Sequence, residues 1–346
     1  MKLFFWGQFT EKEYAMPFCS AWRRQAGSVE HFAYRAVASE LGREKALLGG
    51  FEKIKKFKPD FVVNWQGNSF EEKDSLRLRE CCEEVGAKFV FISLDDPFVL
   101  LHNTRKPYKH AHIAITCCKE SIEFYNNIGI QAIFAPPPCS IEHHIVGQTS
   151  HPRVNGVFYF FTNPYIGDIF VKHGALNRFD SIRELLIKNI PVGLASFDAL
   201  RKNTYLSEGE WAKIDWKGFV PYDDFNQFKN WTLHFNSSVV GQEYTYLNQR
   251  VFEILGIGGV QTLDASPQLL VAFDKLCAEA GVAKEDTPFI FYTTQQEFAS
   301  RSEEFINSPE VQKRKQDAAM RIRWIWTFDH LVRRLAFNEK TFFDRL

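Results

Sequence analysis

The sequence predicts an α/β protein made of two doubly wound domains, each built on a parallel sheet. Its 346 residues exceed what one hydrophobic core usually organises. In both halves, short β-branched or aromatic runs alternate with helical stretches, which is typical of βα units. A polar segment follows Pro136-Pro137-Pro138, and apolar alternation resumes after it. We therefore expect domains over residues 1–150 and 151–325, and a C-terminal helix over 326–346 that is free to return to the first domain.

The elements follow from the spacing of apolar residues. In the first half, strands are expected at residues 2–6, 60–65, 88–93, 111–116 and 131–135, and helices at 28–41, 44–57, 70–85 and 119–128. In the second half, strands are expected at 156–161, 192–195, 233–236, 259–263 and 289–292, and helices at 178–188, 247–255, 267–280 and 294–306. The tail from 311 to 337 has a helical pattern that interleaves basic and aromatic residues.

Composition excludes several classes of protein. Hydrophobic residues make up 45% of the chain and charged residues 24%, so packed cores are expected and disorder is not. Lys plus Arg equals 42 and Asp plus Glu equals 42, so no global field attracts polyanions. The first residues lack a secretory h-region and no apolar run approaches a bilayer span. We expect a soluble cytoplasmic protein without an integral membrane segment.

Metal ligation and disulfides are not expected. The seven cysteines show no CxxC spacing, which indicates reduced thiols. Adjacent His143 and His144 would point to opposite faces of a strand, and no HExxH motif occurs. The sequence therefore predicts no metal site and no resident cofactor.

The segment over residues 241–262 carries the most specific chemistry. A polar loop leads into a helix, and Arg250 and Glu253 share one helix face because they are three residues apart. Free amide groups and the helix dipole favour phosphate at such a start, Arg250 offers a bidentate cation, and a carboxylate accepts bonds from ribose hydroxyls. The alternative is an exposed intrahelical ion pair without function.

The run Leu247-Asn248-x-Arg250-Val251-Phe252-Glu253, followed by Gly256 and Gly258-Gly259, resembles the signature of the CgeB-like, spore-maturation type glycosyltransferases. These are relatives of the group 1 enzymes of the GT-B superfamily. The resemblance spans about residues 60–337 and is strongest after Trp231. It implies the GT-B architecture, two Rossmann-like domains facing a central cleft, and metal-independent transfer from a nucleotide-sugar.

The resemblance also assigns roles in the donor site. Glu253 would bind the ribose and Arg250 the diphosphate, and Glu243, Tyr244 and Asn248 join them as donor-binding candidates. Group 1 enzymes often carry a second glutamate eight residues before the ribose-binding one. This chain has Thr245 there, which leaves retention or inversion open.

Three further candidates come from the ends of other elements. Arg178 begins a helix, as a phosphate-binding arginine does in those families, or it is a solvated arginine. His31 follows Gly27 in what resembles a glycine-rich turn opening a helix, where it is a base, an orienter or a plain helix-start residue. Asp95 and Asp96 follow a strand, so one of them is a candidate general base if burial raises its proton affinity. Asp as a turn former before Pro97 is the alternative.

The predicted function is transfer of a sugar from a donor such as a UDP-sugar to a hydroxyl of a glycan or protein. Phage-type DNA glycosyltransferases that act on hydroxymethylated bases are the first alternative, and the basic tail keeps it open. A GT-B sugar-nucleotide epimerase and a binding protein without catalysis are the others. The alternative interpretation of the tail is that its apolar residues face the core and its basic residues are solvated. Sugar, base, acceptor and oligomeric state are not specified by the sequence.

Overall fold

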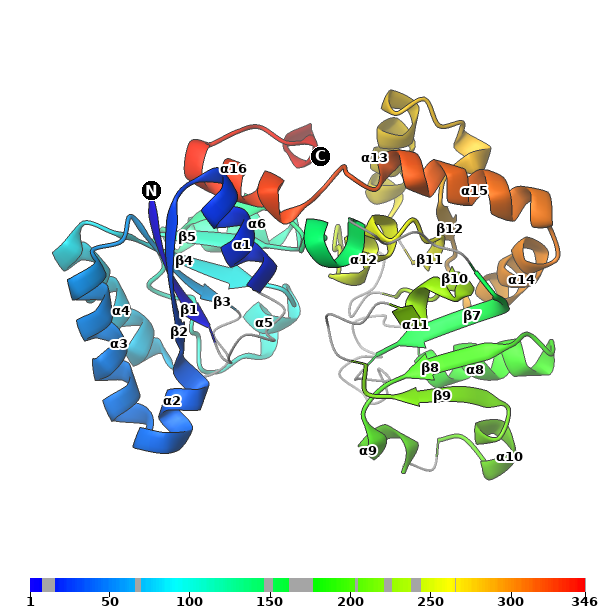
Figure 1. Ribbon diagram of the computed structural model, residues 1–346, viewed down its shortest axis with the longest axis horizontal. Coiled ribbons are helices and arrows are strands. Elements are labelled where there is room, and N and C mark those ends of the chain that lie inside the picture. Colours follow the sequence, from blue (N-terminus) through cyan, green and yellow to red (C-terminus); the bar gives the residue numbers. More distant parts are fainter. Residues whose placement is uncertain are drawn as a thin grey trace. The chain divides into compact units, whose positions relative to one another are not determined.

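The computed structural model describes residues 1–7, 16–65, 70–145, 152–161, 177–202, 205–220, 226–237, 244–264 and 266–345. The chain divides into two compact units (Figure 1). Unit 1 comprises Met1–Pro138 and Thr327–Arg345, and unit 2 comprises Cys139–Trp326. The tail segment that begins at Thr327 thus belongs to the unit that contains the N-terminus.

Unit 1 is a parallel sheet in the order β2-β1-β3-β4-β5-β6. Its strands are β1 (Lys2–Gly7), β2 (Ser28–Ala33), β3 (Phe61–Trp65), β4 (Lys88–Ser93), β5 (Ile113–Thr116) and β6 (Gln131–Phe134). Its helices are α1 (Met16–Gln25), α2 (Tyr34–Leu41), α3 (Arg43–Phe57), α4 (Glu72–Val85), α5 (Phe98–His102), α6 (Ser121–Asn127), α16 (Phe328–Phe337) and the 3-10 turn η3 (Phe342–Arg345).

Alternation along β1 explains why helices cover both faces of this sheet. Phe4 packs in the buried cluster that includes α3 and α4, whereas Phe5 contacts Phe18 of α1. The helices α1 and α16 lie together on the second face (Figure 1), where Arg24 donates to Asp329 at 2.6 Å.

Unit 2 repeats the plan with the order β12-β11-β10-β7-β8-β9. Its strands are β7 (Val154–Phe160), β8 (Val192–Ala195), β9 (Ile214–Gly218), β10 (Trp231–His234), β11 (Gln261–Leu263) and β12 (Phe289–Phe291). Its helices are α8 (Arg178–Ile187), α9 (Asp198–Arg201), α10 (Glu208–Trp211), α11 (Asn226–Lys229), α12 (Arg250–Gly256), α13 (Pro267–Glu279), α14 (Gln295–Ile306), α15 (Pro309–Ile322) and the turns η1 (Ile141–Ile145) and η2 (Lys284–Asp286). Two parallel Rossmann-like sheets confirm the predicted α/β fold class.

The helix expected over residues 28–41 is wrong in its first part. Residues 28–33 form β2, which pairs in parallel with β1, and the helix begins only at Tyr34. Gly27 approaches the backbone of Met1 so closely that a Cβ would lie 2.3 Å from the Met1 carbonyl oxygen. The glycine therefore serves a tight contact at the amino end of β1, and sheet pairing overrides the local helical pattern.

The tail is two helices rather than one. The chain between α15 and α16 is held by Cys139, whose backbone N–H donates to the Trp326 carbonyl at 3.2 Å, and Thr327 and His330 form the capping box of α16. Trp326 and Leu331 are buried, while Lys313 and Arg321 are exposed. Trp326 and Leu331 therefore pack inward, whereas Trp324 is exposed.

Candidate functional site

The residues around Arg250 and Glu253 lie in unit 2 at the start of α12. This helix begins at Arg250, later than the sequence pattern predicts, because Asn248 accepts the Arg250 backbone N–H at 3.0 Å through Oδ1. At the other end, α12 packs tightly on η1, since a Cβ on Gly256 would lie 2.8 Å from the Cβ of His144. This close contact fixes the position of the short helix.

Glu253 is a buried carboxylate with both oxygens engaged. Gln249 donates to its Oε1 at 2.6 Å, and the Arg250 guanidinium forms an ion pair with its Oε2. The Glu253 side chain is 0% exposed and that of Arg250 is 20% exposed. The alternative of a solvent-exposed ion pair is therefore wrong, because the carboxylate is held inside the protein.

Arg250 is further fixed by aromatic rings. Its guanidinium carbon lies 3.8 Å from the centre of the Phe160 ring and 5.8 Å from that of Phe228. Both distances are within the range of a cation–π contact. Phe160 ends β7, so this contact places the cation at the carboxyl edge of the sheet.

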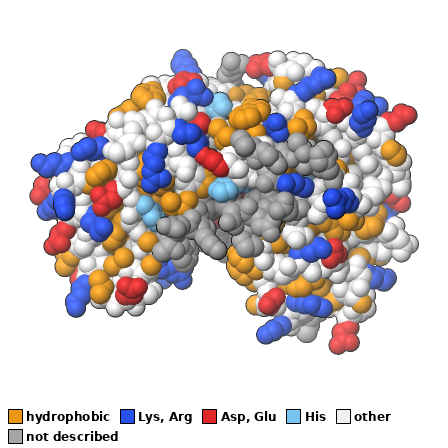
Figure 2. Space-filling model, viewed as in Figure 1, with side chains coloured by type: hydrophobic (Ala, Val, Ile, Leu, Met, Phe, Trp, Pro, Cys, Tyr) orange, Lys and Arg blue, Asp and Glu red, His pale blue; other side chains and the backbone are white. Residues whose placement is uncertain are grey.

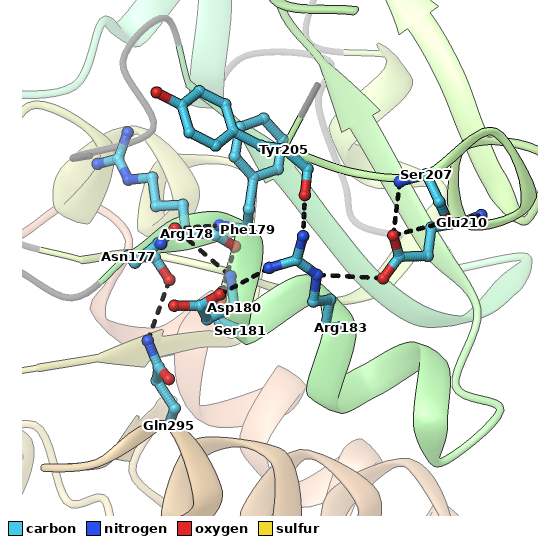
Figure 3. Close-up of polar contacts among 10 residues, drawn as sticks. All are labelled: Asn177, Arg178, Phe179, Asp180, Ser181, Arg183, Tyr205, Ser207, Glu210 and Gln295. Atoms are coloured by element: carbon cyan, nitrogen blue, oxygen red, sulfur yellow. Dashed lines mark hydrogen bonds and ion pairs between the residues drawn. The ribbon is translucent and has the colours of Figure 1, made fainter. Parts of the chain in front are cut away.

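Arg178 approaches the same edge from α8. Asn177 caps this helix by accepting the backbone N–H of Phe179 at 2.9 Å. Figure 3 shows the Arg178 guanidinium directed away from the polar cluster of Arg183. It instead donates from Nε to Ser237 Oγ at 3.1 Å and from Nη2 to the Ser237 carbonyl at 3.3 Å.

Arg183, on the same helix, has a different role. It donates to Asp180 at 2.9 Å and to Glu210 at 3.1 Å, and it also contacts the Tyr205 carbonyl (Figure 3). These contacts tie α8 to α10 and leave Arg178 as the helix-start arginine that faces the carboxyl edge. Arg178 is 9% exposed, so the alternative of a solvated arginine is wrong.

A chain of amide groups joins the two arginines. Asn248 donates from Nδ2 to the Ser237 carbonyl at 3.0 Å and to Asn236 Oδ1 at 2.6 Å. Ser237 therefore contacts both Arg178 and Asn248. Asn248 in turn accepts the backbone N–H of Arg250. Asn236 is held in turn by Gln261, which accepts from its Nδ2 at 2.9 Å.

Asn236 and Ser237 belong to this candidate site in the structure but were not among the residues predicted from the sequence. Both come just after β10, separated from it by Phe235, and ligands in such sheets bind at the carboxyl ends of strands. Two consecutive polar residues after an apolar strand were the available signal. Of the remaining donor-site candidates, Tyr244 is half-buried and Glu243 lies outside the described residues.

In unit 1, the two neighbouring aspartates differ. Asp96 is 0% exposed, and Tyr125 donates its hydroxyl to Asp96 Oδ2 at 2.9 Å. Burial raises the pKa of Asp96 to about 6, against hydrogen bonds from Ser93, Thr116 and Tyr125 that lower it. Asp95 has solvent-accessible surface, although desolvation by the surrounding protein raises its pKa as well. The charge of Asp95 is the smallest of the named influences on the pKa of Asp96. The raised pKa of Asp96 is therefore due mainly to its burial, and repulsion by Asp95 contributes least.

His31 does not join these aspartates. It lies on the edge strand β2 opposite Phe5, and β1 and β3 separate β2 from β4. Strands are spaced by about 4.8 Å, so His31 lies on the order of 14 Å from the line of β4. The residues that directly follow β1, 8–15, are outside the described residues.

The described residues contain neither a candidate metal cluster nor a candidate membrane span. Nowhere in them do three or more His, Cys, Asp or Glu side chains gather in a way that could hold a metal ion. Within the same residues, every helix is too short or too polar to cross a membrane.

Comparison with known proteins gives matches of structure but not of sequence. No family model matches the chain, and no curated protein matches it by sequence. An Anabaena protein, HepE, solved in complex with UDP, has a TM-score of 0.65 and 12% identity, with 100% of each chain covered. An alpha-glucosyltransferase solved with UDP-glucose and DNA containing an abasic site has a TM-score of 0.62 and 11% identity over 97% of this chain and 98% of that one. The lipopolysaccharide outer core galactosyltransferase WaaB has a TM-score of 0.58 and 14% identity over 98% and 100%.

These likenesses show that the fold is that of GT-B glycosyltransferases. At such identities they show the fold alone. Membership of the CgeB-like group stays a prediction from the motif around Arg250.

Proposed function

We propose that this chain transfers a sugar from a nucleotide-sugar, such as a UDP-sugar, to a hydroxyl group of an acceptor. The observation that carries the proposal is the connected cluster in unit 2, in which Arg178 and Arg250 are joined through Ser237 and Asn248. Two cations fixed at the carboxyl edge of a Rossmann-like sheet suit a diphosphate. The UDP and UDP-glucose present in two of the structures of the same fold support this choice of ligand.

The chemistry assigned to the cluster is stabilisation of a leaving group. The acceptor oxygen forms a bond to the anomeric carbon, the bond from that carbon to the diphosphate oxygen breaks, and the nucleoside diphosphate leaves. Negative charge grows on the diphosphate in this step. Guanidinium groups that are already held in place by Phe160 and Ser237 stabilise that charge without reorganisation.

Glu253 is the proposed ribose ligand. Its oxygens are engaged by Gln249 and Arg250, so a ribose takes over the place of the Gln249 amide. Arg250 keeps its ion pair with Glu253 through Nη1 and offers its other guanidinium N–H groups to the diphosphate. Both partners come from the same turn of chain, and the exchange leaves the buried carboxylate hydrogen-bonded throughout. Tyr244, Glu243 and Asn248 remain proposed neighbours of the donor.

Asp95 is the proposed general base that takes the proton of the acceptor hydroxyl. It follows β4 and is exposed, whereas Asp96 is turned inward onto Tyr125. His31, which lies across the sheet from β4, stays a weaker candidate for orienting the acceptor.

The test is a donor and acceptor screen on the full chain. Each of several UDP- and dTDP-sugars is incubated with the protein, with and without a panel of glycan and peptide acceptors, and nucleoside diphosphate and products are followed by mass spectrometry. We expect acceptor-dependent release of nucleoside diphosphate that is lost in Arg250→Gln. A new sugar nucleotide formed from donor alone would identify an epimerase instead. Donor binding without turnover under any condition would identify a protein that only binds.

DNA is the second candidate acceptor, favoured by the alpha-glucosyltransferase solved with DNA. Lys and Arg side chains are interspersed with Asp and Glu on the face shown in Figure 2, so the described residues there form no large basic patch. In the same screen, duplex DNA with hydroxymethylated cytosine separates the two acceptors. If sugar is transferred to that duplex, and the transfer falls steeply with added salt, DNA is the acceptor and the proposal of a glycan or protein acceptor is wrong.

A further inference from the structure

A cavity of about 460 Å³ lies at the free edge of the sheet of unit 2, away from the arginine cluster. It is bounded by β12, η2, α14 and α15. Its apolar floor consists of Phe289, Ile290, Phe291, Phe305 and Val311. This size and apolar character are typical of sites that bind small molecules.

The edge of β12 brings polar backbone groups into this apolar setting. The backbone N–H of Gln261 donates to the Pro288 carbonyl at 3.0 Å, and the backbone N–H of Tyr292 donates to the Leu263 carbonyl at 3.3 Å. In a parallel ladder, bonds to the neighbour alternate along the strand, so the N–H and C=O groups of Phe289 and Phe291 point away from β11. Among the described residues, none pairs with these groups, because β12 is the last strand of the sheet.

Lys315 of α15 places a cation beside this edge. Its ammonium group donates to the Glu285 carbonyl at 2.9 Å and to the Thr287 carbonyl at 2.7 Å. An ammonium group has three N–H donors, so one is left for a ligand. Burial lowers the pKa of Lys315, and the charge of Asp286, which is itself paired with Arg314, offsets this only in part.

The other lining cations already have carboxylate partners. Lys284 pairs with Asp274 at 3.0 Å, Arg314 pairs with Asp286 at 2.8 Å, and Arg301 pairs with Glu297. Lys315 contacts carbonyl oxygens instead. Two lining carboxylates, those of Glu285 and Glu304, are exposed at the rim and solvated, and they disfavour a ligand with several negative charges.

We propose that this cavity binds a small amphiphilic monocarboxylate. The carboxylate accepts from the Lys315 ammonium and from the free edge of β12, and the apolar body lies against Phe305 and Val311. A carboxylate is the group that matches both a cation and unpaired N–H donors, and a single charge fits the acidic rim. A neutral molecule of the same shape would leave the cation unmatched.

Octanoate and octanol, titrated calorimetrically into the full-length protein, test this assignment because they share one apolar chain. We expect octanoate to bind at least tenfold more tightly than octanol. Lys315→Met should remove that preference, whereas Lys313→Met, which changes an exposed lysine of the same helix, should keep it.

A third variant distinguishes the contribution of the apolar cavity to binding from that of the Lys315 charge. Val311→Trp fills the cavity while keeping Lys315, and should abolish binding of both compounds. UDP affinity, measured on each variant, reports that unit 2 is folded and is expected to be unchanged. Equal affinity for octanoate and octanol, a preference that survives Lys315→Met, or binding that survives Val311→Trp would each overturn the assignment. If Lys315→Met does not fold, the wild-type ratio and the Val311→Trp titration decide.

Discussion

At the carboxyl end of β4, unit 1 turns one carboxyl group inward onto Tyr125 and leaves its neighbour exposed. At the carboxyl ends of β7 and β10, unit 2 instead places two guanidinium groups, that of Arg178 on Ser237 and that of Arg250 on Phe160 and Glu253. Both sheets are six-stranded and parallel, although their strand orders differ, so the type of sheet alone does not explain the difference. Side chains placed after equivalent strands give one unit an acidic edge and the other a cationic edge. Each edge can be altered separately.

The exposed carboxylate of unit 1 should show the largest effect. We expect Asp95→Asn to lower turnover by about 10²–10⁴-fold while donor affinity changes little, because a general base acts in the chemical step. Single-turnover rates and calorimetric donor titrations measure the two quantities. Asp96→Asn is the matched control, and its turnover should stay within about tenfold of wild type. The reverse ranking would make the buried aspartate the base.

The buried carboxylate of unit 2 comes next. Glu253→Ala should weaken nucleoside-diphosphate binding by about 10–10³-fold, because charge-assisted hydrogen bonds to ribose are worth about 1.5–3 kcal/mol each. Calorimetry with UDP and 2′-deoxy-UDP tests the role directly. Wild type should prefer the ribose form and the variant should lose the preference.

The burial of Glu253 requires a further control. Removing one partner of a buried pair also destabilises the protein. Glu253→Gln keeps the volume, and melting temperatures of both variants separate folding from binding. If folded Glu253→Ala keeps the full preference for ribose, Glu253 does not bind the ribose and the donor site lies elsewhere.

Several strands and several residues of the candidate site could be predicted from the sequence. The strands over residues 88–93 and 192–195 match their structural bounds, since long β-branched and aromatic runs leave little choice. The sequence also ranked Arg178, Arg250 and Glu253 together, and the network of Asn248 and Ser237 connects the two arginines. Their roles in binding stay a prediction.

The rest depended on tertiary contacts that no local pattern contains. β2 is a strand because β1 lies beside it, and the same residues read alone have helical spacing. β9 was missed because exposed and buried residues alternate over a short span that begins with Ile214. The inward turn of Asp96 depends on Tyr125, which is far along the chain.

The raised pKa of the buried Asp96 predicts that stability depends on pH. The pKa of Asp96 is about 6 in the folded protein against an ordinary 3.8, so the folded state binds the proton more tightly. Stability should therefore fall as pH rises from about 4 to about 6, by about 2–3 kcal/mol. Asp96→Asn should flatten most of this decrease in urea unfolding, and Asp95→Asn, which leaves the Asp96 carboxyl group in place, should keep the part that comes from Asp96. A wild-type curve that is flat over that window would contradict the pKa.

Two arginines of α8 offer a matched pair in unit 2. Arg178→Gln should weaken UDP binding by about 10–100-fold, since a hydrogen bond to a charged group is worth about 1.5–3 kcal/mol. Arg183→Gln removes the same charge from the same helix but breaks contacts to Asp180 and Glu210, so it should lower the melting temperature and leave UDP affinity nearly unchanged. Equal losses of affinity would mean that general positive charge, rather than the position at Ser237, attracts the nucleotide.

The smallest expected effect is that of a chelator. A diphosphate leaving group needs compensating charge, which is supplied either by a divalent ion or by fixed cations. The described residues of unit 2 place Arg178 and Arg250 at the sheet edge, each held by neighbours before any ligand arrives. We therefore expect turnover in excess EDTA to stay within about twofold of turnover in added Mg²⁺ or Mn²⁺, because the arginines already provide that charge. Donor affinity should be equally insensitive. Arg250→Gln sharpens the test, since a metal-dependent reaction would keep its response to Mg²⁺ in that variant. Loss of turnover in EDTA that one divalent ion restores would assign the leaving-group charge to a metal instead.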